Sequence, residues 1–170
     1  MDLRSFIRAV PDFPKPGILF RDITPLLQDV DAFRYSIARL LDRYRDVQLD
    51  VIVAIESRGF LFGAPLAYQM GKPIVPVRKP GKLPAPTHAA EYTLEYGSDT
   101  MEIHVDGVSS GQRVLLLDDL LATGGTLEAT ARLVEMSGGV VCGIGVIIEL
   151  TQLEGRKRLG GHDIFSLIQY

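Results

Sequence analysis

Four short apolar runs divide the chain, and none alternates with polar residues as a strand with one wet face would. They read VIVAI from Val51, PIVPV from Pro73, VLLLD from Val114 and VVCGIGVII from Val140. Strands of this kind are buried on both faces, which is typical of a parallel sheet covered by helices on each side. The runs therefore predict a central, mainly parallel β-sheet.

Helical periodicity occupies the segments around these runs. The apolar side chains of residues 31–44 fall on one helix face, with charged residues elsewhere on the wheel. Residues 59–71 and 125–139 are each long enough for a crossover helix between parallel strands, and each ends in glycine, which favours helix termination. Together the strands and helices predict an α/β, doubly wound fold.

Residues 91–106 differ because apolar and polar positions alternate, with the turn signal GSD between the two halves. This pattern predicts a β-hairpin with one buried face. The side chains expected on that face are Tyr92, Leu94, Tyr96, Met101, Ile103 and Val105.

The segment before the hairpin, RKPGKLPAPTHAAEY at residues 78–92, is rich in proline, glycine and lysine and nearly empty of core residues. It is too long for a minimal connector in a compact domain. We therefore expect a mobile functional loop that continues into the hairpin over residues 79–96.

The N-terminal segment has a composition of its own. Residues 11–27 carry four prolines and a glycine around the apolar stretch ILF, so regular helix is not expected there. We expect residues 1–30 to form an ordered arm, or hood, over a single domain that spans residues 1–170. With 46% hydrophobic residues, a chain of this length can bury one sizeable core.

Charge and apolar run lengths argue against several classes of partner. The net formal charge is −3, and the charged residues are spread along the chain, so nothing favours nucleic acid or an acidic membrane. The longest apolar run, residues 140–148, is too short to span a bilayer, and the N-terminus does not resemble a signal peptide. The single cysteine, Cys142, permits no intramolecular disulfide. We expect a cytoplasmic protein that acts on small molecules.

Two adjacent carboxylates, Asp118 and Asp119, follow the third apolar run. Because side chains alternate across a strand, one of them would be buried under a helix, at a cost of several kcal/mol, if the strand continued inside the sheet. We therefore expect both to lie at the end of the strand. Ligands of open α/β sheets bind beyond the carboxyl ends of the strands.

The loop that follows, ATGGT at residues 122–126, has the properties of a phosphate site. Gly124 and Gly125 permit close approach of the backbone, while Thr123 and Thr126 add hydroxyl donors at an expected helix N-terminus. A turn capped by either threonine explains the loop alone equally well. The adjacent carboxylates favour a ligand, and a ribose 5-phosphate fits, with its phosphate in the loop and its hydroxyls on the aspartates.

A second junction, AIESRGF, follows the first predicted strand. Ser57, Arg58 and Gly59 present a guanidinium group and backbone N–H groups to the same edge of the sheet. Taken alone, Arg58 would more often be a surface residue paired with a nearby acid such as Glu56. Taken with the first loop, it predicts a second anion site.

Other motifs are excluded. The pairs Gly71-Lys72 and Gly81-Lys82 are not followed by serine or threonine, so the chain has no Walker loop, and the Gly-x-Gly at residues 143–145 lacks the third glycine of a dinucleotide site. The three histidines, His88 in the loop with His104 and His162, lack zinc-ligand spacing and are expected at the surface. The basic run EGRKRLGG at residues 154–161 indicates a solvated helix or turn.

These residues match a known family. The stretch from Val114 to Thr126 resembles the phosphoribosyl-pyrophosphate signature of the type I phosphoribosyltransferases. ESRGF, RKPGKLP, LEYG, FPKPGILFRDITPLL and FSLIQY extend the likeness over nearly the whole chain and are similar to the members that use adenine. The resemblance implies the fold of that family and a glycosyltransferase (pentosyltransferase) of purine salvage that makes AMP and pyrophosphate. It also implies a homodimer, and Mg²⁺ carried by phosphoribosyl pyrophosphate without a direct protein ligand.

The resemblance also assigns roles to individual residues. Asp118 and Asp119 would bind the ribose hydroxyls, and the 5′-phosphate would be bound by Ala122, Thr123, Gly124, Gly125 and Thr126. The pyrophosphate would be held by Ser57, Arg58, Arg78, Lys79 and Lys82. Arg58 and Lys82 would also be catalytic, and Arg78 would reach across a dimer interface.

For the base, the resemblance implies that Phe20 stacks on adenine while the backbone at Leu19 and Arg21 reads its edge. Glu95 would act as acid and base at the imidazole nitrogen of the purine, with Tyr96 beside it. Glu95 also fits an outward-facing hairpin residue with no catalytic role.

Two alternatives remain beside the adenine enzyme. One is a non-catalytic sensor of phosphoribosyl pyrophosphate, which would more naturally lack the acid/base residue or the basic loop; Glu95, Arg58 and Lys82 are all present here. The other is the same reaction on hypoxanthine, guanine or xanthine.

Overall fold

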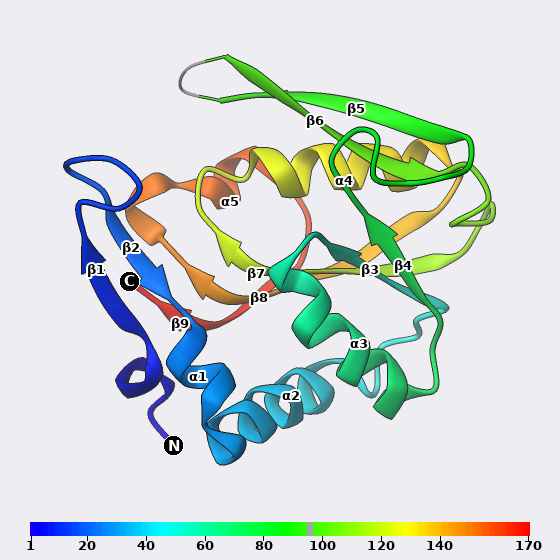
Figure 1. Ribbon diagram of the computed structural model, residues 1–170. Coiled ribbons are helices and arrows are strands. Elements are labelled where there is room, and N and C mark those ends of the chain that lie inside the picture. Colours follow the sequence, from blue (N-terminus) through cyan, green and yellow to red (C-terminus); the bar gives the residue numbers. More distant parts are fainter. Residues whose placement is uncertain (95–96) are drawn as a thin grey trace.

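The computed structural model describes residues 1–94 and 97–170. Its centre is a five-stranded sheet with the strand order β4-β3-β7-β8-β9. These strands are β3 (Val51–Ile55), β4 (Ile74–Val77), β7 (Arg113–Leu121), β8 (Val140–Glu149) and β9 (Ile164–Gln169). Every neighbouring pair is parallel, which confirms the predicted sheet (Figure 1).

The edge strand β9 was not expected from the apolar runs. Its sequence IFSLIQ is interrupted by Ser166 and Gln169, whose side chains both donate hydrogen bonds to the carboxylate of Glu149. A strand that contains such polar residues has no continuous apolar run, so the apolar pattern did not predict it.

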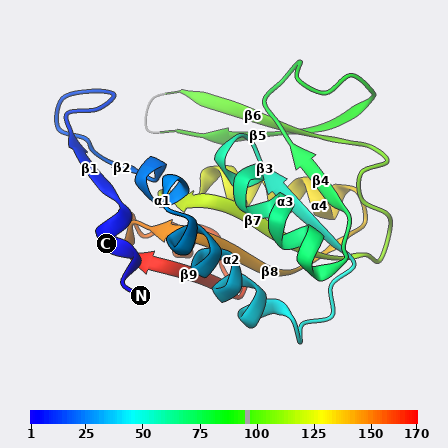
Figure 2. The ribbon, with the colours of Figure 1, turned by 60° about the horizontal axis from the view of Figure 1, so that its bottom comes forward.

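Helices cover both faces of the sheet, as a doubly wound fold requires (Figures 1 and 2). One face carries α1 (Thr24–Gln28), α2 (Val30–Tyr44) and α3 (Arg58–Met70), and the other carries α4 (Gly125–Met136). Successive residues of β7 pack into these two layers, since Leu115 and Leu117 join the cluster of α2 and α3, and Leu116 joins the cluster of α4. None of the described helices is long and apolar enough to cross a membrane.

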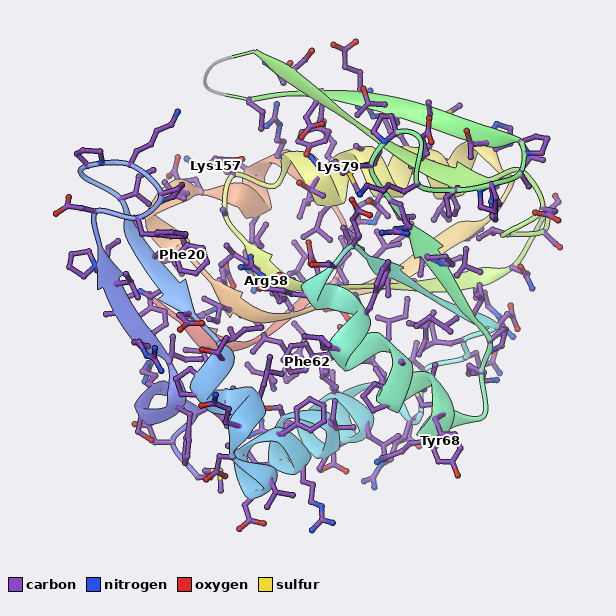
Figure 3. All side chains as sticks on the ribbon, viewed as in Figure 1. Phe20, Arg58, Phe62, Tyr68, Lys79 and Lys157 are labelled. Atoms are coloured by element: carbon purple, nitrogen blue, oxygen red, sulfur yellow. The ribbon has the colours of Figure 1, made fainter. Side chains whose placement is uncertain are left out.

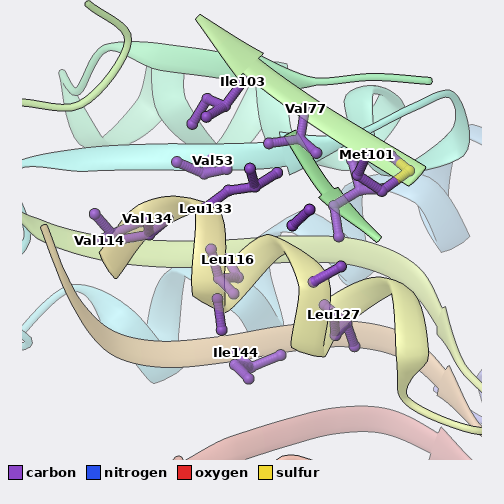
Figure 4. Close-up of a cluster of buried hydrophobic side chains, with 14 of the residues drawn as sticks. Val53, Val77, Met101, Ile103, Val114, Leu116, Leu127, Leu133, Val134 and Ile144 are labelled. Carbon is purple, nitrogen blue, oxygen red and sulfur yellow. The ribbon is translucent and has the colours of Figure 1, made fainter. Parts of the chain in front are cut away.

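An antiparallel hairpin of β5 (Thr87–Thr93) and β6 (Ser98–His104) lies over α4. Met101 and Ile103 from the hairpin meet Leu127 and Leu133 of α4, and all four are at most 1% exposed (Figure 4). Each such buried side chain contributes about 1.5–3 kcal/mol. The helix is thus held between the sheet and the hairpin.

The hairpin begins earlier than the sequence indicated. Residues 87–90, expected in the loop, pair with residues 101–104 as part of strand β5, so His88 lies in a strand. Tyr92, Met101 and Ile103 are buried as predicted, but Leu94 and Val105 are each 42% exposed because they lie just past the paired residues. Glu95 and Tyr96 lie outside the described residues.

The N-terminal arm contains a 3₁₀ turn at Leu3–Phe6 and an antiparallel ribbon of β1 (Arg8–Pro11) and β2 (Leu19–Asp22). The expectation that residues 11–27 contain no regular helix is wrong at their end, where α1 begins at Thr24. Pro25 lies in the first turn of α1, where its missing N–H group has no helical partner to lose. A second 3₁₀ turn (Thr151–Leu153) and α5 (Gly155–Arg158) connect β8 to β9.

Candidate active site

The two aspartates lie within β7 rather than at its end. β7 runs on to Leu121 because β8 continues to pair with it, up to Leu121 opposite Glu149. On its other side β3 pairs only with Val114–Leu117 before the chain turns into α3. Asp118 and Asp119 therefore lie at the carboxyl edge left open by the shorter neighbour, which corrects the predicted strand end but keeps the predicted location at the ligand edge.

Both carboxylates are buried, with Asp118 8% and Asp119 5% exposed. The backbone N–H of Asp119 donates to Oδ1 of Asp118 over 2.8 Å. Burial raises the pKa of both groups, and the neighbouring charge of Asp119 raises the pKa of Asp118 further, well above its ordinary range. The charged form of Asp118 is therefore disfavoured in the free site, and a cationic group beside it would favour that form.

Arg58 is the cation closest to this pair. As the first residue of α3, it places its Nε 2.7 Å from Oδ2 of Asp119, and this contact opposes the effect of burial on the pKa of Asp119. Glu56, the acid considered as its surface partner, instead accepts a hydrogen bond from Nε of Arg78 over 2.6 Å. Arg58 therefore belongs to the site rather than to a surface pair.

The predicted phosphate loop, Ala122–Thr126, runs from the end of β7 into α4. Gly124 has φ of 86°, and among the described residues no side chain caps the first turn of α4, so neither threonine acts as the cap. The N–H groups at this helix start are available to an anion. A Cβ on Gly124 would lie 2.6 Å from the carbonyl oxygen of Gly155, and a Cβ on Gly125 would lie 2.8 Å from the ring of Tyr92. These two positions of the loop therefore have room for glycine only.

One cavity of about 370 Å³ joins these parts. It is lined by most of the predicted phosphate-binding and ribose-binding residues, which are Ser57, Arg58, Lys79, Asp118, Asp119 and residues 122–126. It is also lined by residues that sequence reasoning did not assign, namely Glu56, Tyr92, Met101, Leu120 and Leu127. Tyr92 was expected only as a buried hairpin residue, and its hydroxyl gave no separate signal in the sequence.

Lys79 reaches the cavity from the loop and is held by the hairpin (Figure 3). Its ammonium group pairs with the carboxylate of Asp99 and donates to the hydroxyl of Tyr92 over 3.3 Å. Asp99 lies in β6, 20 residues further along the chain, so the sequence gave no reason to connect it with Lys79.

Two other predicted pyrophosphate residues do not line the cavity. Arg78 is paired with Glu56 and bridges the backbone of Glu102, while Lys82 is exposed. The structure therefore brings three of the five predicted pyrophosphate residues to the cavity.

The N-terminal arm places Phe20 beside the site. The guanidinium carbon of Arg58 lies 5.4 Å from the centre of the Phe20 ring, within cation–π range (Figure 3). Leu19 is 48% exposed, and the guanidinium of Arg21 stacks on the ring of Tyr170 at 3.8 Å. An aromatic face and its flanking backbone thus stand next to the charged cavity.

The comparisons with known proteins agree with this geometry. The family described as phosphoribosyl transferase domain matches residues 22–168. The adenine phosphoribosyltransferase of Solibacter usitatus is 59% identical over 169 residues, which cover 99% of this chain and 98% of that protein.

Two solved structures are similar over almost the whole chain. The adenine phosphoribosyltransferase of Thermoanaerobacter pseudethanolicus has a TM-score of 0.97 at 58% identity, covering 99% of this chain and 98% of that one. The enzyme of Saccharomyces cerevisiae, complexed with D-2,5-dideoxy-2,5-imino-altritol 1,6-bisphosphate and adenine, has a TM-score of 0.91 at 39% identity, covering 98% and 96%. The chain therefore belongs to the phosphoribosyltransferase family and, within it, to the adenine phosphoribosyltransferases.

Proposed function

We propose that this protein transfers the 5-phosphoribosyl group of phosphoribosyl pyrophosphate to adenine, giving AMP and pyrophosphate in cytoplasmic purine salvage. The observation that carries the proposal is a single cavity that combines a glycine loop at a helix start, two carboxylates and a guanidinium group. The groups of phosphoribosyl pyrophosphate follow the same order: its 5′-phosphate matches the glycine loop, its ribose hydroxyls match the carboxylates, and its pyrophosphate matches the guanidinium group. Adenine as the base is supported by the relatives at 58–59% identity.

The ribose 5-phosphate end is bound by the start of α4. Backbone N–H groups of residues 122–126 and the threonine hydroxyls hold the phosphate, helped by the helix dipole. The carboxylates of Asp118 and Asp119 accept hydrogen bonds from the ribose hydroxyls. Because both carboxylates are buried, they orient the sugar in a fixed position.

The pyrophosphate end is held by Arg58, Lys79 and the backbone near Ser57, and Lys82 comes in with its loop. Mg²⁺ would arrive with phosphoribosyl pyrophosphate and would offset the negative charge of its pyrophosphate group. Mg²⁺ usually keeps several waters and binds substrate phosphates, so it needs no direct protein ligand here. The Mg²⁺ ion, brought close to the aspartate pair with the substrate, would lower the pKa of Asp118 and favour its ionised form.

Charge development explains how these groups act on the reaction. As the bond from C1′ to pyrophosphate breaks, positive charge grows on the sugar near Asp118 and Asp119, and negative charge grows on the leaving group near Arg58 and Lys79. A nitrogen of adenine forms the new bond to C1′ and loses its proton to Glu95, with Tyr96 beside it. Phe20 stacks on the base, and the backbone at Leu19 and Arg21 reads its edge.

A homodimer completes the proposal. Tyr68 of α3 is 89% exposed (Figure 3), Leu61 of α3 is 44% exposed, and Ile74 of the edge strand β4 is 39% exposed. Burial of these exposed apolar side chains between two copies would stabilise a dimer. Arg78 follows the edge strand β4 directly, and in this proposal it leaves Glu56 to reach the site of the second copy. Size-exclusion chromatography with light scattering measures the mass of the protein in solution and tests this proposal. A monomer at micromolar concentration would contradict it.

The test of the reaction supplies phosphoribosyl pyrophosphate, Mg²⁺ and one purine base at a time. We expect AMP from adenine and far less nucleotide from hypoxanthine, guanine or xanthine. Absence of AMP would overturn the proposal. If phosphoribosyl pyrophosphate still bound in that case, the sensor alternative would be favoured instead.

A further inference from the structure

Glu149 is a buried carboxylate that the proposed reaction does not use. It ends β8 at the carboxyl edge of the sheet and is only 4% exposed. It accepts hydrogen bonds from Nε and Nη2 of Arg156 over 2.6 and 2.7 Å, and from Ser166 and Gln169 over 2.7 and 3.1 Å. Burying a carboxylate costs several kcal/mol unless it is fully paired. An arrangement this complete fixes the position of Arg156.

Arg156 in turn fixes α5, which has only four residues and is too short to be stable without tertiary contacts. Its Nη1 also donates to the carbonyl oxygen of Ile164 in β9 over 3.0 Å. From the other side of α5, Nε of Arg158 lies 3.0 Å from the carboxylate of Glu128 in α4. The basic run expected to be a solvated helix or turn is therefore tied to β8, β9 and α4.

These contacts of Arg156 and Arg158, which we call the tether, hold α5 in place. The first residue of α5 is Gly155, which is buried against the phosphate loop. A Cβ on Gly155 would lie 2.3 Å from the carbonyl oxygen of Ala122 and 3.1 Å from the backbone nitrogen of Gly124. The two backbones are in direct contact, so the position of α5 sets the position of the loop.

We infer that Arg156, through its paired hydrogen bonds to Glu149, is a positioning residue for the 5′-phosphate site. It holds Gly155 against residues 122–124, and so it sets the spacing of the backbone N–H groups that face the phosphate. This inference rests on the proposed function of that loop. It adds residues outside the cavity to the set that determines affinity for the phosphoribosyl end of the substrate.

The first test compares two probes that correspond to the two opposite ends of phosphoribosyl pyrophosphate. Ribose 5-phosphate carries the sugar and the 5′-phosphate, whereas inorganic pyrophosphate carries only the other end. Arg156→Lys keeps the positive charge but cannot make two parallel bonds to Glu149. We expect calorimetry to show the Kd for ribose 5-phosphate raised roughly tenfold, as small misplacements of a binding group commonly do, with the Kd for pyrophosphate unchanged.

Lys157 provides the matched control on the same helix. It is 74% exposed and pairs with Glu154 three residues before it (Figure 3). Lys157→Ala should leave the Kd values for both probes at the wild-type level. A Kd for ribose 5-phosphate that rises equally in both variants would overturn the inference, because it would show that any change in α5 disturbs the loop, whether or not the pairing of Arg156 with Glu149 is altered.

A second variant covers the case in which Arg156→Lys fails to fold. Gly155→Ala leaves the Glu149 pair intact and pushes a methyl group at the loop, so it should raise the Kd for ribose 5-phosphate selectively. Both changes act through the same contact. The Kd for ribose 5-phosphate should therefore rise less in the double variant than the product of the two single fold-changes. A folded Gly155→Ala protein with wild-type affinity for ribose 5-phosphate would overturn the inference. AMP formation by the wild type tests the proposed function separately.

Discussion

Nε of Arg58 lies 2.7 Å from Oδ2 of Asp119, and this ion pair joins the start of α3 to β7 at the cavity. The carboxylate side chain is 7% exposed and the guanidinium side chain 40%. Burial therefore falls mainly on Asp119, whose ionised form depends on Arg58. Arg58, which is proposed to bind pyrophosphate, thus also favours the ionised form of Asp119, which is proposed to bind ribose.

Arg58→Ala should weaken both ends of the site. The pKa of Asp119 should rise further because its largest opposing influence is removed, and the leaving group should lose a cation. We expect kcat/KM for phosphoribosyl pyrophosphate to fall about 100-fold or more, as loss of one transition-state donor typically does. Steady-state kinetics measures this. The control is Arg45→Ala, which removes a side chain that is 62% exposed and lies in surface pairs, and an equal loss there would contradict the prediction.

Asp118→Asn should stabilise the unliganded protein at neutral pH. Burial holds the pKa of Asp118 well above its ordinary value of 3.8, while the unfolded chain ionises near that value. Between the two pKa values the unfolded state binds fewer protons, so the free energy of unfolding falls as pH rises. Asparagine does not titrate, and its carbonyl oxygen can still accept the hydrogen bond from the N–H of Asp119.

The measurement is urea unfolding from pH 4 to pH 8 with and without the substitution. The advantage of Asp118→Asn should be greatest at the highest pH and should shrink as pH falls toward 3.8. Affinity for phosphoribosyl pyrophosphate should drop at the same time, because a ribose ligand is lost. A stability difference that is constant with pH would show that Asp118 is ionised in the free protein.

Local chemistry in the sequence was sufficient for the parts of the site that follow strands. Continuous apolar runs predicted β3, β4, β7 and β8 of the sheet, and adjacent Asp118 and Asp119 could only be tolerated at the ligand edge. The end of β7 was misjudged because its pairing with β8 outlasts its pairing with β3. How far β7 pairs on each side depends on the lengths of its neighbours β3 and β8. The run VLLLD by itself contains no information about those lengths.

Contacts between distant segments could not be predicted in this way. Nothing near Arg58 in the sequence distinguishes Asp119 from Glu56 as its partner, and the choice follows from how α3 meets β7. The same holds for Glu149 and Arg156, which are seven residues apart across two turns. The run EGRKRLGG has the composition of an ordinary surface segment. Nothing in it indicates that Gly155 is buried or that Arg156 pairs with the buried carboxylate of Glu149.

Asp99→Asn should release Lys79 for the substrate. In the unliganded site the ammonium group pairs with Asp99, so pyrophosphate must compete with that carboxylate. The neutral amide competes less, and we expect the Kd for pyrophosphate to fall about threefold, the size of a partly exposed ion pair. Asp106→Asn, at an exposed residue beyond the hairpin strands, is the control. Weaker pyrophosphate binding after Asp99→Asn would mean that Asp99 positions Lys79 instead of competing for it.

Gly124→Ala and Gly71→Ala separate backbone strain from the shape of the phosphate loop. Both glycines have positive φ, 86° and 61°, so each alanine should cost about 1–2 kcal/mol of folding stability. Only Gly124 has a close neighbour, the carbonyl oxygen of Gly155 at 2.6 Å from the added Cβ, whereas a Cβ on Gly71 meets nothing within 4 Å. Thermal unfolding should therefore respond to both changes, and the KM for phosphoribosyl pyrophosphate should rise in Gly124→Ala alone. If Gly71→Ala raised that KM as much, strain anywhere in the fold would affect the site, and the loop would have no special need for its contact with α5.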